Sequence, residues 1–246
     1  MRIGILGGMG PLAGVELQRR IIEYTPADRD QDHLEVVCFT NPHISDRSIS
    51  LANDDGKKFA EQLDASLKVL ARARVDCIAI PCNTAHARFE ELQRGVSVPI
   101  VNMIGLVLEA LEMNPELTPI GLLATDGTIK GGMYQSNPRG VGRWFIPGAE
   151  IQAGVMRAVS LIKGGRGGEA LPLLRSAVRD VAGRGAKTVV LGCTEISLYR
   201  KEIGAMGCRL IDPLDLLARK LVALATTGAS TILSDALVKS RPSLEG

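Results

Sequence analysis

Short apolar runs alternate with amphipathic stretches along almost the whole chain. Each run is bounded by glycine, proline or small polar residues, a pattern typical of strands buried in a parallel sheet. Between the runs, apolar residues recur at helical spacing, as Leu63, Leu67 and Leu70 do. Strands are predicted at 3–6, 34–39, 77–80, 98–101, 120–124, 143–146, 187–191 and 209–211. Helices are predicted at 59–73, 84–94, 103–113, 149–162, 168–183 and 213–225.

This alternation begins twice. A glycine-rich turn follows the strand at 3–6, and a hydroxyl-rich turn follows the strand at 120–124. Strands that alternate with helices form parallel sheets, and an internal duplication would leave a cleft between its two copies. The predicted fold is α/β, with two similar lobes, each a mostly parallel sheet flanked by helices, and the active site in the cleft. The first lobe is predicted to comprise residues 1–100 and 208–246, and the second residues 101–207.

A cysteine follows one strand in each half of the chain. Cys82 comes after Ile80-Pro81, Cys193 comes after Leu191-Gly192, and a short polar cluster follows each of them. Ligands of open α/β sheets bind at the carboxyl ends of the strands. The helix N-terminus that follows such a strand lowers the pKa of a thiol and attracts a carboxylate. The two turns therefore predict a pair of thiols that face one small anionic substrate.

Composition removes several classes of function. Hydrophobic residues make up 46% of the chain and charged residues 23%, which suits a soluble globular protein. Aromatic residues are only 3%, which argues against base stacking on single-stranded nucleic acid, and a net charge of +2 implies neither a nucleic-acid nor a membrane partner. No apolar stretch approaches the length of a membrane span, so we expect a cytoplasmic protein.

The cysteines leave three interpretations open. They are odd in number and show no Cys-x-x-Cys spacing, which favours reduced thiols over disulfides or a zinc site. His86 could activate Cys82 as a nucleophile, but Cys82 precedes the predicted helix, so the two residues are not expected on one helix face. Two inert buried thiols are the second interpretation. The favoured one is a two-base pair, in which one thiolate removes a proton from carbon while the opposite thiol donates one.

Two loops beside these turns are further candidates. The turn Gly7-Gly8-Met9-Gly10-Pro11 meets the dinucleotide-binding pattern only in part, because Pro11 removes an amide donor and no acidic residue ends the next strand. We expect it to approach a small substrate through its backbone instead. Arg47 lies in the loop after the strand at 34–39 and could pair with a substrate carboxylate in a bidentate way.

These motifs together carry a family resemblance. The turn at residues 7–11, Pro81-Cys82-Asn83-Thr84-Ala85-His86, Gly121-Leu122-Leu123-Ala124-Thr125 and Gly192-Cys193-Thr194-Glu195 resemble those of the aspartate/glutamate racemase family, most closely its aspartate racemase branch. The resemblance extends over nearly the whole chain. It implies a PLP-independent, metal-free proton transfer at the α-carbon of aspartate or glutamate, with Cys82 and Cys193 on opposite sides of the cleft. It also implies a homodimer.

The resemblance further implies which residues meet an acidic amino acid. Arg47 and Lys163 would bind its carboxylates, and the remaining substrate-binding positions would be Met9, Asn83, Thr84, Thr125, Thr128, Thr194 and Glu195. Other activities remain open for such an architecture: isomerisation of an unsaturated diacid, hydantoin racemisation, or decarboxylation of a malonate. A non-catalytic module that binds acidic amino acids is the alternative of a different class.

Overall fold

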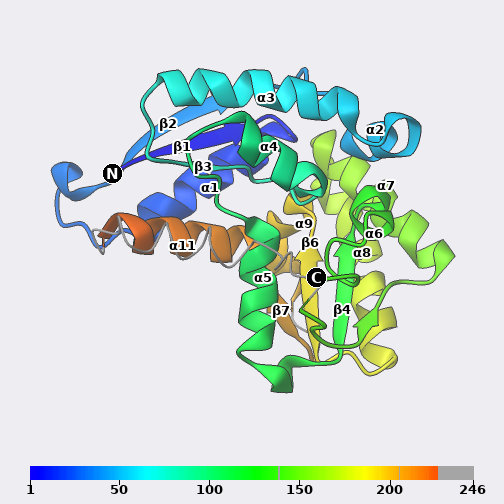
Figure 1. Cartoon of the computed structure of the whole chain (residues 1–246). Helices are drawn as coiled ribbons and strands as arrows, with labels where there is room; N and C mark the ends of the chain where they lie inside the picture. The colour runs from blue at the N-terminus through cyan, green and yellow to red at the C-terminus, as the bar shows by residue number, and fades with distance from the viewer. Residues whose placement is uncertain (138, 205, 227–246) are drawn as a thin grey trace, which may run out of the picture.

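The computed structural model describes residues 1–137, 139–204 and 206–226 of the 246-residue chain, and they form two parallel sheets flanked by helices (Figure 1). The strand order is β2-β1-β3 in the first sheet and β5-β4-β6-β7 in the second. This arrangement confirms the predicted α/β fold. The strands are β1 (Arg2–Gly7), β2 (Glu35–Thr40), β3 (Cys77–Ala79), β4 (Ile120–Ala124), β5 (Trp144–Phe145), β6 (Thr188–Gly192) and β7 (Arg209–Ile211).

Helices cover both faces of the first sheet. Alternate residues of a strand point to opposite faces, so Leu6 of β1 packs towards α3 while Ile5 packs towards α1 and α11. Figure 1 shows α3 on one side of this sheet, and α1 and α11 together on the other. The bounds of these helices are Pro11–Tyr24 for α1, Lys57–Arg72 for α3 and Pro213–Thr226 for α11.

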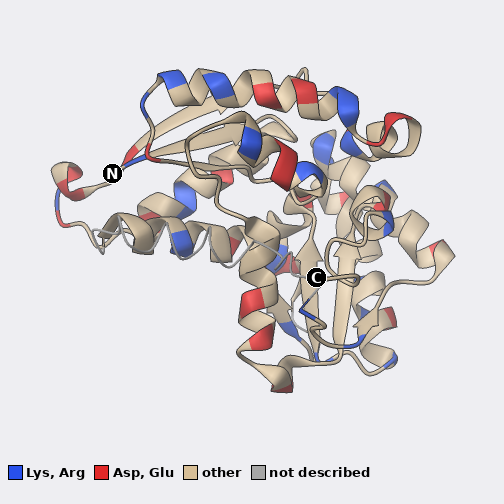
Figure 2. Cartoon of the chain, viewed as in Figure 1, with Lys and Arg blue, Asp and Glu red and all other residues tan. Residues whose placement is uncertain are grey.

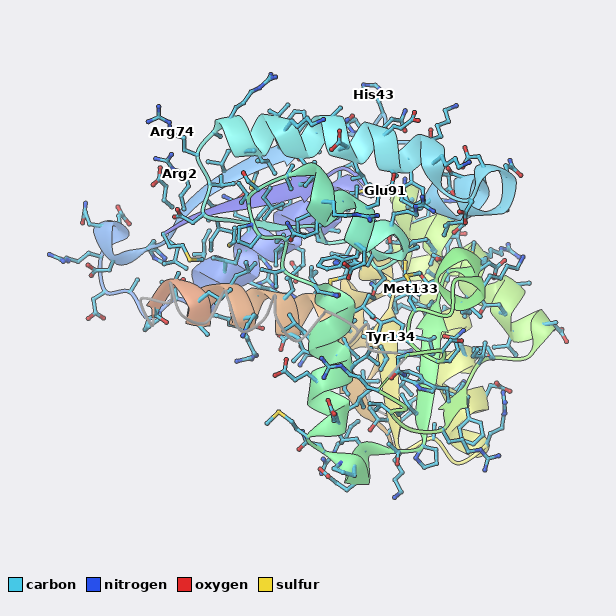
Figure 3. All side chains as sticks on the ribbon, viewed as in Figure 1. Arg2, His43, Arg74, Glu91, Met133 and Tyr134 are labelled. Carbon is cyan, nitrogen blue, oxygen red and sulfur yellow. The ribbon has the colours of Figure 1, made fainter. Side chains whose placement is uncertain are left out.

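The second sheet is covered in the same way. Leu122 of β4 packs with α5 (Met103–Glu112), and Leu123 packs with α7 (Ala149–Lys163) and α8 (Gly167–Gly183). The segment that follows α6 (Asp126–Lys130) lies beside α5 and adds the fully buried ring of Tyr134 to this core (Figure 3). The remaining helices are α2 (Arg47–Asp54), α4 (Phe89–Gly95), α9 (Thr194–Ser197) and α10 (Arg200–Ile203), with short 3-10 helices at Asp30–Asp32, Thr84–Arg88 and Pro115–Leu117.

Two predicted elements differ from the structure. Residues 98–101 form no full strand: Ile100 makes an isolated bridge with Ile78, because Pro99 has no amide to donate and the Gln93 side chain accepts a hydrogen bond from the Ile100 amide at 2.7 Å. The helix predicted at 84–94 begins as a 3-10 helix and becomes α-helical only at Phe89.

The C-terminal segment from residue 208 was predicted to belong wholly to the first lobe. Instead β7 pairs with β6 in the second sheet, whereas α11 packs on α1 beside the first sheet. Neighbouring sheet edges and helix faces determine this split, and the periodicity of a short strand cannot indicate which sheet it joins. Residues 227–246 lie outside the described part, and the division into lobes otherwise stays a prediction.

Basic residues lie towards both ends of α3, and its acidic residues lie between them (Figure 2). Within residues 1–137, 139–204 and 206–226, no helix is long and apolar enough to cross a membrane.

Candidate active site

The two cysteine turns meet at one small cavity. Cys82 follows β3 and Cys193 follows β6, and each side chain is 5% exposed. Of the predicted site residues, all except Thr128 line this cavity, together with four residues that the sequence had not indicated. The lining consists of Met9, Asp46, Arg47, Ser48, Cys82, Asn83, Thr84, Thr125, Met156, Val159, Lys163, Cys193, Thr194 and Glu195.

Thr128 lies behind the cavity wall instead of in it. It is fully buried, and its hydroxyl lies 2.9 Å from that of Thr84 and 3.1 Å from that of Thr125. The hydroxyls of Thr84 and Thr125 are 3.0 Å apart, which completes a triangle. Thr84 comes from the first cysteine turn and Thr125 from the N-terminus of α6, so this triangle fixes two donors of the cavity wall relative to each other.

The four residues that sequence analysis missed come from α2 and α7. Asp46 caps α2, accepting a hydrogen bond from the Ile49 amide at 3.0 Å, and Ser48 follows in the first turn. Met156 and Val159 lie on α7, at helical spacing from Lys163, which the sequence had indicated. Asp46 could have been recognised as a cap only with a helix predicted at Arg47–Asp54, and the sequence pattern predicted none there. Met156 and Val159 could not have been recognised, because their spacing is equally typical of the apolar stripe of a helix that faces the core.

Both ring nitrogens of His86 have structural partners. Nδ1 lies 2.9 Å from the Cys82 carbonyl, which can only accept, so Nδ1 carries the proton, and Nε2 accepts from the Met103 amide at 3.2 Å. Burial lowers the pKa of this imidazole, which favours its neutral form. His86 therefore has no free nitrogen for the Cys82 thiol, and the Cys-His nucleophile is not supported.

Cys193 has a carboxylate partner. Its Sγ donates to Glu195 Oε2 at 3.0 Å, and Glu195 Oε1 accepts from the Gly10 amide at 3.0 Å. Burial, followed by the charge and the hydrogen bond of Glu195, raises the pKa of the Cys193 thiol well above its usual value, while Lys163 acts in the opposite direction. Cys193 is thus held as a thiol when Glu195 is ionised.

The guanidinium of Arg47 is largely engaged by backbone. Nη1 donates to the carbonyls of Ile44 at 3.3 Å and Ser45 at 3.0 Å, and Nη2 donates to the Met9 carbonyl at 3.3 Å. Its buried Nε has no partner among the described residues. Three of its five N–H donors are thus used, which leaves Nε and one N–H of Nη2 for the bidentate pairing predicted from the sequence. Lys163 lines the same cavity.

Asn83 adds an unpaired donor. Its side chain is 2% exposed, and Oδ1 accepts from the hydroxyl of Tyr134. With the oxygen so engaged, Nδ2 has no hydrogen-bond partner among the described residues. An amide donor that is buried and unsatisfied at a cavity wall is suited to a ligand oxygen.

The backbone of a neighbouring loop, at Asn41, packs directly against Gly8 of the glycine-rich turn. Gly8 has φ +110°, and a Cβ there would lie 2.1 Å from the Asn41 carbonyl oxygen, so the close approach is to the neighbouring loop and not to a ligand. Met9, in the same turn, lines the cavity. Among the residues that the structure describes, no three His, Cys, Asp or Glu side chains gather in a way that could hold a metal ion.

Known proteins share this architecture. The chain is similar to an aspartate racemase from Picrophilus torridus, with a TM-score of 0.78 and 27% identity over 92% of this chain and 94% of that one. A glutamate racemase from Thermus thermophilus, in complex with beta-chloro-D-alanine, shares the fold with a TM-score of 0.64, 23% identity and coverage of 92% and 81%. The broad specificity amino-acid racemase RacX of Bacillus subtilis (strain 168) is 28% identical over 201 residues, 79% of this chain and 86% of that protein.

Two parallel α/β sheets with a cysteine from each at one cavity, together with these likenesses, define an isomerase of the racemase type. The chain belongs to the Asp/Glu/Hydantoin racemase family, whose sequence profile matches residues 6–221. The resemblance seen in the sequence motifs is thereby confirmed.

Proposed function

We propose that the protein interconverts L- and D-aspartate, with glutamate as a second candidate substrate, by a cofactor-independent transfer of the α-proton between Cys82 and Cys193. The observation that carries the proposal is the single cavity that both thiols line together with Lys163. A cation beside two thiols suits a substrate with a second carboxylate. The aspartate racemase from Picrophilus torridus supports the choice of aspartate.

The Cα–H bond of an amino acid is a very weak acid, so the site must stabilise charge as well as move protons. One cysteine, as thiolate, would remove the α-proton from one face, and the other, as thiol, would protonate the opposite face. Negative charge develops on the α-carboxylate, where the free donor Asn83 Nδ2 would bind it. The hydroxyl of Thr84 or Thr125 would donate as well once it gives up its bond within the threonine triangle. Lys163, with Arg47 Nε, would bind the side-chain carboxylate.

Subunit pairing and location follow from the family resemblance. We propose a homodimer in the cytoplasm. Three apolar side chains of α1 are at least half exposed, Leu12 at 58%, Val15 at 61% and Ile22 at 50%, and offer a surface for association. Light scattering on the purified protein measures the mass directly, and a monomer would contradict the pairing.

Proton NMR in heavy water tests the activity. With L- or D-aspartate, then glutamate, the α-proton signal should disappear while chirality inverts, and Cys82→Ser or Cys193→Ser should abolish inversion. A Cys193→Ser variant that inverts aspartate at the wild-type rate would refute the two-base reaction. If no acidic amino acid exchanges its α-proton, the same assay on hydantoins, unsaturated diacids and malonates separates the other activities, and binding without exchange would indicate a binding module.

A further inference from the structure

Glu195 contacts the second cysteine and the first lobe at the same time. The side chain is 5% exposed, and its two oxygens have different partners, Cys193 Sγ and the Gly10 amide, both at 3.0 Å. Gly10 precedes α1 in the first lobe, and a Cβ at this position would lie only 3.0 Å from Glu195 Oε1. The two hydrogen bonds hold the carboxylate beside the sulfur, and a side chain at position 10 would crowd it.

We propose that Glu195 is a positioning residue that makes the two cysteines unequal: Cys193 serves as an acid beside ionised Glu195, and as a base only with a proton held on Glu195. This inference rests on the proposed two-cysteine reaction and deepens it. The family resemblance had suggested substrate binding for Glu195, whereas both of its oxygens have protein partners.

The reason is electrostatic. Two negative charges at hydrogen-bonding distance in a buried site repel each other strongly. A state in which Cys193 is a thiolate and Glu195 is ionised therefore has a high free energy. In one state Cys82 is a thiolate, Cys193 is a thiol and Glu195 is ionised. In the other, Cys82 is a thiol, Cys193 is a thiolate and Glu195 holds a proton. The second state thus carries one proton more than the first, and that proton comes from solvent.

Other charges face the pair from each element around it. Lys163 of α7 and Arg47 of α2 line the cavity as cations, and Asp46 lines it as an anion. On the other side of α9, Arg20 of α1 donates to the Ser197 carbonyl at 3.4 Å, and Asp212 accepts from the Ser197 hydroxyl at 2.7 Å. Among the charged side chains of the described residues, Glu195 alone accepts a hydrogen bond from Cys193 Sγ.

A difference of one proton has a kinetic consequence. The two enantiomers have equal free energies, so kcat/KM is the same in both directions at every pH. It follows that the ratio of the two kcat values equals the ratio of the two KM values. This ratio must change with pH when the complex with the L-enantiomer and the complex with the D-enantiomer bind different numbers of protons. The change is at most about tenfold per pH unit.

Glu195→Gln tests this in the full-length protein. Glutamine keeps an oxygen for the Gly10 amide and presents an NH₂ group to the sulfur. Between about pH 6 and pH 9 the ratio of kcat for L- to D-aspartate should change by roughly tenfold or more in the wild type and stay within about twofold in the variant. Glu150→Gln, at an exposed position in the first turn of α7 and outside the cavity lining, is the matched control and should leave the wild-type dependence intact. A constant ratio in the wild type, or the same dependence in Glu195→Gln, would overturn the proposal.

A second measurement does not depend on racemisation. In a Cys82→Ser background, the rate at which methyl methanethiosulfonate modifies Cys193 reports its thiolate, with the modified peptide identified by mass spectrometry. Glu195→Gln should move the midpoint of this pH profile down by about one unit or more. An unchanged midpoint refutes the role of Glu195 even if the protein is a racemase, whereas a shifted midpoint without racemisation refutes the proposed function alone.

Discussion

Thr194, at the start of α9, donates a hydrogen bond from Oγ1 to the carbonyl of Pro81 in the turn after β3, over 3.2 Å. Pro81 directly precedes Cys82, and Thr194 directly follows Cys193. Both residues are buried, so the bond is formed away from water. One contact thus links the two cysteine turns and fixes how they face each other.

Replacing Thr194 by valine should uncouple the two turns. Valine keeps the shape but leaves the buried Pro81 carbonyl unpaired, which costs about 1–3 kcal/mol of unfolding free energy. We expect a lower midpoint of urea unfolding and a fall in kcat/KM for aspartate of roughly tenfold. Thr194→Ser, which retains the hydroxyl, should stay close to the wild type. Equal stability and rates for the valine and serine variants would show that the bond contributes nothing.

Substitutions that remove the charge of Lys163 or of Arg47 should affect the protein differently. Lys163→Met removes the cation that lines the cavity, and we expect the KM for aspartate to rise roughly 30-fold or more while thermal stability is kept. Arg47→Met also leaves the carbonyls of Ile44, Ser45 and Met9 without donors, so it should lower the melting temperature as well. Lys163→Arg is the control for charge. A normal KM in Lys163→Met would exclude Lys163 from substrate binding.

His86→Asn should spare most of the activity. Asparagine can still donate to the Cys82 carbonyl, while the Met103 amide loses its acceptor. The racemisation rate should fall by no more than about tenfold, against a loss of 100-fold or more expected for Cys82→Ser. Circular dichroism of both variants checks folding. A loss as large as that of Cys82→Ser, in a folded variant, would restore the Cys-His interpretation.

The buried ion pair of Arg20 and Asp212 is a stability determinant. The pair is 2.6 Å long, its residues are 5% and 4% exposed, and Asp212 also accepts from the Leu214 amide at 3.0 Å. Arg20→Met leaves the carboxylate uncompensated, so urea unfolding should show a loss of about 3–5 kcal/mol. The double variant Arg20→Met/Asp212→Asn should recover about half of that loss. No recovery would indicate that Arg20 contributes through packing instead of charge.

Alkaline pH should destabilise the fold through Cys77. Burial, and next the charge of Asp76, raises the pKa of this thiol from 9.0 to about 12. A raised pKa in the folded state gives stability that is complete below the unfolded pKa and disappears as pH rises towards the folded value. The unfolding free energy should therefore decline by about 1.4 kcal/mol per pH unit between about pH 9 and pH 12 from this group. Cys77→Ala should show a slope that is shallower by that amount, and an unchanged slope would contradict the assignment.

Much of the site could be predicted because its residues follow strand ends. Cys82, Asn83 and Thr84 directly follow one apolar run, Cys193 and Thr194 another, and strand ends of parallel sheets gather at one edge. Met156 and Val159 escaped prediction because a helix that lines a cavity has the same periodicity as one that faces a core. Thr128 was placed in the cavity for a related reason: its position in the motif does not indicate whether its hydroxyl faces ligand or protein.

The sequence by itself determined the strands, most of the helices, the two cysteine turns and the family, because these depend on local periodicity, turn residues and short motifs. The tertiary structure determined which polar groups already have partners. Arg47 is held by backbone carbonyls, and Glu195 joins Cys193 to Gly10 across 185 positions of the chain. A hydrogen bond between distant residues depends on how the two sheets are placed, and no local pattern encodes that placement.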